Sequence, residues 1–173
     1  TEFIARHEIT EVLFTPSLLE TTLNTLDADL IRSRLSSVKV MWLNGEVVTT
    51  KLKHRAFDVL PSHVLLLNTY SISESHDVSD ADLSDEEDLP SGFCTVGLPG
   101  DKVELLLLDE DGKVVSSGTA GELYIGGPCL ARGYLNKPAL TAERFVWIDG
   151  KRYYRTGDVA EILSNGRLEI KGR

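Results

Sequence analysis

The first half of the chain alternates between short apolar runs and segments with helical spacing. Three of the apolar runs are expected to form strands, at residues 9–14, 38–43 and 63–67. Ser17 and Glu20 have the spacing of a capping box at the start of a helix, and Thr49 or Thr50 is placed to begin another. A strand–helix–strand–helix–strand order predicts right-handed crossovers and a parallel sheet.

The second half has shorter strand-like runs separated by glycines. These are expected at residues 94–96, 102–108, 122–125, 152–154 and 168–170. The segments 109–112 and 164–166 have turn composition, and a short helix is expected over 138–145 with Pro138 at an early position. The sequence therefore predicts an α/β chain: part of a parallel α/β layered subdomain at 1–85, followed by a small distorted antiparallel β-barrel subdomain at 86–173.

Net charge limits the choice of partners. The 173 residues carry 27 acidic against 18 basic side chains, a formal net charge of −9. Such a surface repels nucleic-acid phosphate, so no nucleic acid is expected as a partner. Much of the acidity lies in residues 77–88, which are expected to form a solvated loop, with a docking surface for a basic partner as the alternative.

Cysteine usage and hydropathy exclude other classes. Cys94 and Cys129 have no CxxC spacing, which argues against a disulfide framework or a zinc site. Cys94 lies in an apolar stretch and is expected to be a buried thiol. No apolar run approaches the length of a membrane span, so no membrane is expected as a partner and a cytoplasmic setting fits.

Candidate chemistry begins where the strands of the first half end. Residues 44–46 (Asn-Gly-Glu) and 68–70 (Asn-Thr-Tyr) follow two expected strands, and ligands of open parallel sheets bind at such carboxyl ends. Gly45 would let a ligand approach the backbone, Tyr70 offers a flat face for a base, and Glu74 offers an oxygen ligand for Mg²⁺. The alternatives are a turn glycine, a core tyrosine and a surface glutamate.

One residue of the second half has comparable potential. Asp158 follows Thr156 and Gly157, and a single carboxylate can accept hydrogen bonds from both hydroxyls of a ribose. The alternative is an ordinary turn aspartate.

Four segments in this order resemble the adenylate-forming (AMP-binding) superfamily, and most closely the adenylation domains of nonribosomal peptide synthetases. They lie at residues 68–74, 121–127, 131–135 and 154–158. The resemblance implies that residues 1–85 belong to the large N-terminal subdomain of such a domain. It also implies a reaction in which ATP activates a small carboxylic or amino acid as an acyl-adenylate, which then passes to a phosphopantetheine thiol. ATP and magnesium are the implied cofactors, and a carrier domain in the same polypeptide is the implied partner.

The resemblance assigns roles to single residues. Asn68 and Tyr70 would frame the adenine, Ser73 would contact the α-phosphate, and Glu74 would reach magnesium. Asp158 would bind the ribose. The full implied nucleotide set is Asn44, Gly45, Glu46, Asn68, Thr69, Tyr70, Ser73, Asp158 and Arg173.

The resemblance also implies an acyl pocket. Its implied residues are Ser17, Trp42, Asn44, Thr69, Asp77 and Val78. The face of Trp42 and the charge of Asp77 together suit an ammonium group, which predicts a small acid with a cationic nitrogen, an amino acid or a betaine-like compound. The alternative is that Trp42 is ordinary core and Asp77 begins the acidic loop.

Two departures qualify these expectations. Ser71 and Ile72 replace the family's usual Gly-Pro, which supports a degenerate, noncatalytic scaffold or interaction module as the alternative function. The family's phosphate loop and the lysine of its C-terminal subdomain do not appear among these residues. The chain by itself is therefore expected to hold half an active site, with no confident catalytic residue, and to be inactive alone.

Overall fold

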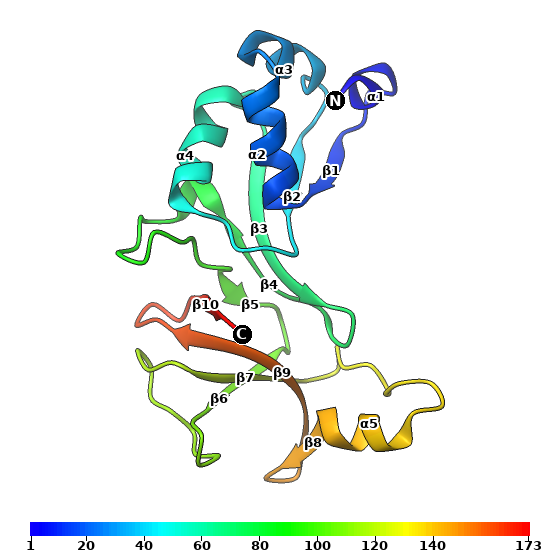
Figure 1. The fold of residues 1–173 in the computed structure, drawn as a ribbon, viewed down its shortest axis with the longest axis vertical. Coiled ribbons are helices and arrows are strands. Elements are labelled where there is room, and N and C mark those ends of the chain that lie inside the picture. Colours follow the sequence, from blue (N-terminus) through cyan, green and yellow to red (C-terminus); the bar gives the residue numbers. More distant parts are fainter. The chain divides into compact units, whose positions relative to one another are not determined.

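The computed structural model describes all 173 residues, Thr1–Arg173, and its elements are traced in Figure 1. The chain forms two compact units. The first unit comprises residues 1–69 and 81–94, and the second unit comprises residues 70–80 and 95–173. No helix is long and apolar enough to cross a membrane.

The first unit is built on a parallel sheet. Its strands are β1 (Glu11–Phe14), β2 (Val40–Leu43) and β3 (Leu65–Ile72), with β2 in the middle. Four helices accompany them: α1 (Glu2–Arg6), α2 (Pro16–Thr25), α3 (Ala28–Arg34) and α4 (Thr50–Val59). The parallel α/β arrangement predicted from the apolar runs is confirmed.

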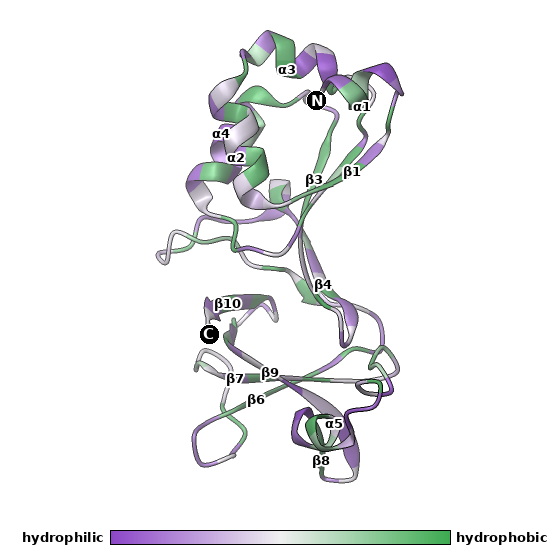
Figure 2. Cartoon of the chain, turned by 45° about the vertical axis from the view of Figure 1, so that its right-hand side comes forward, coloured by the Kyte–Doolittle hydropathy of each residue, from purple (hydrophilic) through white to green (hydrophobic).

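The alternation of buried and partly exposed residues along β2 shows which face of this sheet the helices cover. Met41 and Leu43 are fully buried in one core with leucines of α2 and α4. Trp42, on the opposite face, is half-buried, and its neighbour in β1, Leu13, is 66% exposed. Figure 2 shows hydrophobic stretches along β1 and β3, whereas α2 and α4 carry hydrophobic and hydrophilic residues side by side. The helices therefore cover one face of the sheet only.

The start of α2 differs from the prediction. The cap is Thr15, whose hydroxyl accepts a hydrogen bond from the Leu18 amide at 3.2 Å, and Pro16 occupies the first helical turn. Ser17 was expected to cap the helix, which is wrong, because the proline ring fixes a helical φ and needs no amide partner at this position. The expected start of α4 is confirmed, with Thr49 accepting from the Leu52 amide at 3.1 Å.

The expected acidic loop over 77–88 is also wrong in its first part. Residues His76–Asp82 form strand β4, and a 3-10 turn follows at Leu83–Asp85. Val78 and Ala81 are buried. Asp77 and Asp80, which flank these apolar positions, are exposed and hide the strand pattern, because their neighbours are buried.

Three further strand predictions differ from the structure, one of them being the strand expected at 152–154, which extends over residues 151–162. β3 was expected to end at residue 67 but continues to Ile72. Residues 94–96 were expected to form a strand, which is wrong. The amides of Cys94 and Val96 donate instead to the carbonyls of Val48 and Leu168, and the nearby short strand is β5 (Leu98–Pro99), which pairs with β4.

The second unit is mainly a curled antiparallel sheet. Its strand order is β10-β9-β7-β6, and β8 pairs antiparallel with residues 151–154 of β9. The bounds are β6 (Glu104–Leu108), β7 (Gly121–Gly126), β8 (Phe145–Ile148), β9 (Lys151–Ile162) and β10 (Leu168–Gly172), and α5 (Pro138–Arg144) precedes β8. The predicted small antiparallel subdomain, the short helix and the 164–166 turn are confirmed.

A buried ammonium ties α4 to the segment that follows the 3-10 turn. Lys53 is 4% exposed, and its Nζ donates to the Glu86 carbonyl at 2.7 Å and to Asp88 Oδ1 at 2.6 Å. His54 Nε2 lies 2.6 Å from Asp88 Oδ2. Hydrogen bonds from Lys53 and then from His54 lower the pKa of Asp88. Both α4 side chains therefore favour the charged form of this carboxylate.

Asp88→Asn is expected to lower the urea midpoint of unfolding at neutral pH, because a neutral amide leaves the buried Lys53 ammonium without its negatively charged partner. The folded pKa of Asp88 lies below its ordinary value of 3.8, so the wild-type stabilisation is present above pH 3.8 and is lost as pH falls through the folded pKa. Urea unfolding from pH 2 to 7 measures both effects. Asp29→Asn, which removes an exposed pair with Arg32, is the control. Equal midpoints for the two variants would contradict the assignment.

Candidate functional site

Three residues that the sequence singled out meet around one carboxylate in the second unit. Tyr70 donates its hydroxyl proton to Asp158 Oδ2 at 2.5 Å, although 88 positions separate the two residues. Arg173 Nε donates to Asp158 Oδ1 at 2.8 Å. Asp158 is 5% exposed, and both of its oxygens have charged or polar partners, as a buried carboxylate requires. We call these three residues the aspartate cluster.

A bulge in β9 holds Asp158. Glu122 of β7 pairs with Val159 and Tyr124 pairs with Arg155, so three residues of β9 lie opposite Leu123 alone. Gly157 lies in the middle with φ +77°, a conformation that glycine adopts without strain. Thr156 Oγ1 donates to the Leu123 carbonyl at 2.7 Å and accepts from the Asp158 amide at 2.9 Å. The Thr-Gly-Asp sequence therefore encodes a local distortion of a long strand.

Two members of the aspartate cluster, Tyr70 and Arg173, have raised pKa values. Burial, followed by the hydrogen bond to Asp158, raises the pKa of Tyr70 above its usual value near 10. The hydrogen bond to Asp158 also raises the pKa of Arg173. Tyr70 is therefore a donor at any physiological pH, and Arg173 keeps its positive charge beside the carboxylate.

A second group of polar side chains surrounds Glu74. Tyr134 donates its hydroxyl proton to Glu74 Oε1 at 2.5 Å, and the Tyr134 and Tyr154 hydroxyl oxygens are 3.2 Å apart. The Ala131 amide donates to the Glu74 carbonyl at 2.7 Å. Burial, followed by the hydrogen bond to Glu74, raises the pKa of Tyr134. We call Glu74, Tyr134 and Tyr154 the glutamate cluster.

The chemistry of these donors can be compared with the implied ligands. A carboxylate has about four acceptor positions, so Asp158 can accept from ribose hydroxyls in addition to its present partners. No group of three or more metal-ligating side chains exists in the chain. Glu74 alone suits Mg²⁺ that is held mainly by phosphate oxygens, since Mg²⁺ often uses one or two carboxylates plus substrate phosphates.

In the first unit, two expected site residues bond to each other. Ser17 donates from its backbone amide to Glu46 Oε2 at 2.9 Å and from its hydroxyl to Oε1 at 2.8 Å. Glu46 therefore supports the first turn of α2. Gly45 has φ +88° and no neighbour within 4 Å of an added Cβ, so its backbone conformation, rather than crowding, favours glycine.

The remaining expected residues of the first unit lie on or just after strands. Trp42 lies in β2, and the Asn44 amide, just after it, donates to the Phe14 carbonyl at 3.1 Å. Asn68 and Thr69 are buried in β3, at 1% and 6% exposure. The Thr69 hydroxyl has no hydrogen-bond partner, which leaves it able to bond to a ligand.

The other expected residues of the second unit differ widely in exposure. Ser73 and Asp77 are exposed, and Asp77 lies 3.2 Å from the His76 ring. Val78 is fully buried in the core that contains Leu123. In this structure Val78 therefore acts as a core residue.

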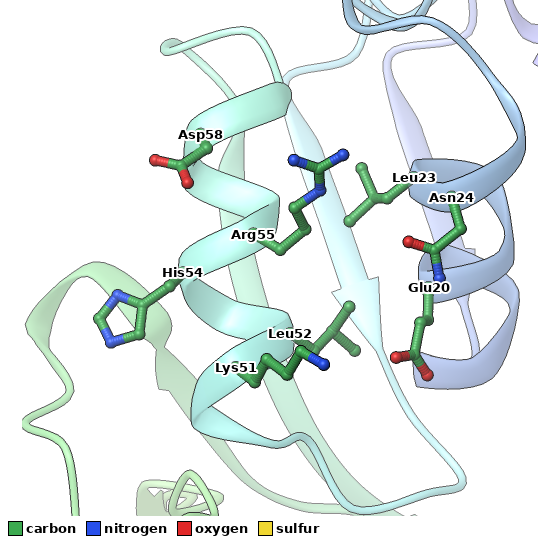
Figure 3. Close-up of a pocket in the computed structure, with 8 residues that line it drawn as sticks. All are labelled: Glu20, Leu23, Asn24, Lys51, Leu52, His54, Arg55 and Asp58. Carbon is green, nitrogen blue, oxygen red and sulfur yellow. The ribbon is translucent and has the colours of Figure 1, made fainter.

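The groove shown in Figure 3 is lined by none of these residues. It runs between α2 and α4 of the first unit, and Lys51 and Arg55 point toward α2 while His54 points away from it. Its lining residues are Glu20, Leu23, Asn24, Lys51, Leu52, His54, Arg55 and Asp58. None of them belongs to the expected nucleotide or acyl set.

Sequence reasoning missed three contributors. Tyr134 and Tyr154 lie in segments that carry the family resemblance but have no predicted role of their own, and Thr156 enters the prediction only as a neighbour of Asp158. The available signal was chemical, because each carries a hydroxyl within a glycine-containing motif. Their hydrogen-bond partners could not be predicted from the sequence, since residues such as Glu74 and Tyr134 are 60 positions apart.

Comparisons with known proteins agree with the expected family. The sequence model of the family described as AMP-binding enzyme matches residues 1–135. Glycine betaine reductase ATRR of Emericella nidulans is 43% identical over 177 residues, which cover 99% of this chain and 14% of that protein. Zwittermicin A synthase ZmaJ of Bacillus cereus is 36% identical over 171 residues, which cover 96% of this chain and 32% of that protein.

Solved structures agree with the fold. PA1221, an NRPS protein containing adenylation and PCP domains, has a TM-score of 0.85 at 29% identity, covering 99% of this chain and 34% of that chain. The AMPPNP-bound form of the nonribosomal peptide synthetase FmoA3 has a TM-score of 0.86 at 26% identity, covering 99% and 19%. The chain thus spans a minor part of the proteins it matches, and the match to the family model over most of its residues shows that it belongs to the AMP-binding enzyme family.

Proposed function

We propose that this chain is the nucleotide-binding part of an adenylation domain. In the proposed reaction, the carboxylate oxygen of a small acid attacks the α-phosphorus of ATP, pyrophosphate leaves, and an acyl-adenylate forms. A carrier-domain phosphopantetheine thiol then displaces AMP to give a thioester. The observation that carries the proposal is the aspartate cluster, in which Tyr70 of β3 and Arg173 after β10 both bond to Asp158 of β9.

Within this proposal Asp158 accepts hydrogen bonds from the ribose hydroxyls. Its two oxygens are held in place by Tyr70 and Arg173, so the carboxylate is oriented before a ligand arrives. Asn68 and Tyr70 frame the adenine, and Ser73 contacts the α-phosphate. Support for this part comes from the order of the four motifs and from family membership. Asn44, Gly45, Glu46 and Thr69 complete the proposed nucleotide set.

Magnesium is proposed to lie against Glu74. A hard cation prefers carboxylate and phosphate oxygens, and Glu74 is a carboxylate whose side chain and backbone are both held by hydrogen bonds. A magnesium ion there would shield negative charge on the phosphates. ATP, magnesium and the carrier-bound phosphopantetheine are the proposed cofactors.

The proposed substrate is a small acid with a cationic nitrogen. Trp42 offers an aromatic face on the sheet surface that the helices of the first unit leave uncovered, and Asp77 offers an exposed carboxylate. The 43% identity to a protein named glycine betaine reductase favours a quaternary ammonium acid over a common amino acid. Ser17, Asn44, Thr69 and Val78 complete the proposed acyl set.

The proposal includes a wider setting. The large N-terminal subdomain would supply residues 1–85 and the β-barrel subdomain residues 86–173, with a carrier domain in the same polypeptide. Neither nucleic acid nor a membrane is a proposed partner, and the two free cysteines support a cytoplasmic location. The noncatalytic scaffold is not favoured, because the relatives are synthases, synthetases and reductases.

These 173 residues alone are expected not to catalyse acid-dependent ATP–pyrophosphate exchange, because they contain no Ser/Thr/Gly-rich phosphate loop ending in lysine. The measurement compares the isolated chain with the full-length protein under the same conditions. Exchange by the isolated chain above the background without acid would contradict this expectation.

In the full-length protein, Asp158→Ala is expected to weaken ATP binding by about 1.5–3 kcal/mol, the range for hydrogen bonds to a charged group. Titration calorimetry with ATP measures the affinity directly. Asp101→Ala removes an exposed carboxylate from a turn of the same unit and is expected to leave it unchanged. If the two variants bind ATP equally well, the ribose assignment of Asp158 is wrong.

Substrate charge can be tested with two acids of nearly the same shape. Glycine betaine and 3,3-dimethylbutanoate differ mainly in a positive nitrogen against a neutral carbon. A desolvated cation over an aromatic face contributes about 2 kcal/mol, so the full-length enzyme is expected to prefer the betaine by roughly 30-fold in kcat/KM. Asp77→Asn is expected to reduce this preference, whereas Asp80→Asn on the same strand is not. A wild-type preference for the neutral acid would overturn the cation pocket while leaving carboxylate activation intact.

A further inference from the structure

Tyr134 belongs to a segment that carries the family resemblance without a predicted role of its own, yet its hydroxyl donates to the carboxylate proposed to bind magnesium. We propose that Tyr134 is a positioning residue, which orients the Glu74 carboxylate toward the metal-bearing phosphates of the nucleotide. In this proposal Tyr154 holds Tyr134 in place through the contact between their hydroxyl groups. The inference rests on the proposed function, since it concerns a residue of the same site. It adds a role for two tyrosines to which neither the motif nor the composition assigns one.

The direction of the hydrogen bonds follows from counting protons. An ionised glutamate only accepts, so the single hydroxyl proton of Tyr134 is donated to Glu74 Oε1 at 2.5 Å. The Tyr134 oxygen can then only accept from Tyr154, whose oxygen is 3.2 Å away. The result is a directed chain from Tyr154 through Tyr134 to Glu74. Such a chain polarises each hydrogen bond toward the Glu74 carboxylate and restricts the rotation of that carboxylate.

Tyr134 is itself held from several sides. Gly133 has φ +142°, and an added Cβ would lie 2.5 Å from Thr141 Cγ2, so only glycine fits beside α5 at this point. The Tyr134 amide donates to Thr141 Oγ1 at 2.9 Å. Its ring packs edge-on against Phe145 with centroids 5.8 Å apart, and Phe145 contacts the Tyr154 ring at 5.0 Å.

Arg152 fixes the backbone just before Tyr134. Its guanidinium donates to the Ala131 and Arg132 carbonyls at 2.8 and 2.9 Å, and lies 4.4 Å from the centre of the Phe145 ring. The Ala131 amide in turn donates to the Glu74 carbonyl at 2.7 Å. Glu74 is therefore held at its backbone and at its side chain by one short segment, residues 131–134.

This arrangement is typical of a residue that orients a metal ligand. One acceptor position of Glu74 is used by Tyr134, and the remaining positions of the carboxylate stay available to a cation. Groups that orient metal ligands from behind typically change metal affinity or activity by about 10–100-fold when they are removed. A purely structural tyrosine would affect stability without affecting the metal dependence.

The test measures nucleotide binding by the full-length protein with and without magnesium. Titration calorimetry with AMPPNP, a non-hydrolysable ATP analogue, is run once with excess Mg²⁺ and once with EDTA. Tyr134→Phe keeps the ring packed on Phe145 and removes only the hydroxyl. It is expected to weaken binding in Mg²⁺ about tenfold and to leave binding in EDTA unchanged. Glu74→Gln is expected to show the same selective loss.

Tyr153→Phe is the matched control. Tyr153 lies next to Tyr154 in β9 and is 7% exposed, and its hydroxyl bonds to another carboxylate, Glu104 Oε2, at 3.1 Å. This variant should alter neither measurement. Tyr154→Phe provides a second test of the chain and is expected to give a smaller loss than Tyr134→Phe, restricted to the magnesium condition. The double variant Glu74→Gln/Tyr134→Phe should lose no more AMPPNP affinity in Mg²⁺ than Glu74→Gln alone.

Two results would overturn the inference, and they differ in meaning. If Glu74→Gln reduces binding in Mg²⁺ but Tyr134→Phe behaves like Tyr153→Phe, the proposed function stands and Tyr134 has no positioning role. If the wild-type protein binds AMPPNP in neither condition, the proposed function fails and the inference fails with it. A loss of equal size with Mg²⁺ and with EDTA also counts against it, because that pattern indicates general damage to the site.

Discussion

The hydrogen bond between Tyr70 and Asp158 is the contact on which the organisation of the candidate site depends. It joins positions 88 residues apart, and it lies where Asp158 is almost fully removed from water. Burying a carboxylate without hydrogen-bond partners lowers the stability of the folded state. In Asp158 one oxygen accepts from Tyr70 and the other from Arg173, which offsets this penalty. The end of β3, the bulge of β9 and the residue that follows β10 are thus constrained by one side chain.

Strand β9 connects this carboxylate with the second polar cluster. Tyr154 and Asp158 lie four residues apart on it, and the bulge at Gly157 separates them. Bulges re-aim side chains and are frequent next to functional sites. In this sheet the bulge allows a long strand to supply a hydroxyl to the glutamate cluster and a carboxylate to the aspartate cluster without a loop between them.

Aromatic packing supports the polar contacts of the glutamate cluster. Tyr134 packs edge-on against Phe145, the Phe145 and Tyr154 rings are tilted against each other, and the Arg152 guanidinium lies over the Phe145 ring. Because the rings are fixed by packing, the hydroxyl groups of Tyr134 and Tyr154 have little freedom, which lowers the entropy lost when Tyr134 bonds to Glu74 and Tyr154 bonds to Tyr134. Glycine at position 133 is part of the same device, since a larger residue would push this segment away from α5.

Local patterns were sufficient for much of this fold. Apolar runs and capping residues predicted the parallel strands, the helix starting at Thr49 or Thr50 and the turn at 164–166, because hydrophobic period and turn chemistry are properties of a few adjacent residues. The motifs around Tyr70 and Asp158 identified the family for a similar reason. Where a neighbouring residue changed the local balance, as Pro16 did for Ser17, the prediction failed by one or two positions.

The tertiary structure decided the features that depend on distant partners. Strand β4 forms although its sequence is strongly acidic, because the side chains of Val78 and Ala81 are buried by segments that the local sequence does not reveal. The hydrogen bond between Tyr134 and Glu74 and the hydrogen bond between Tyr70 and Asp158 join segments 60 and 88 residues apart. By itself the sequence determined which chemical groups the chain possesses and which short elements carry them. Only the folded chain decided which groups meet, because contacts between distant segments depend on how the sheets and helices pack.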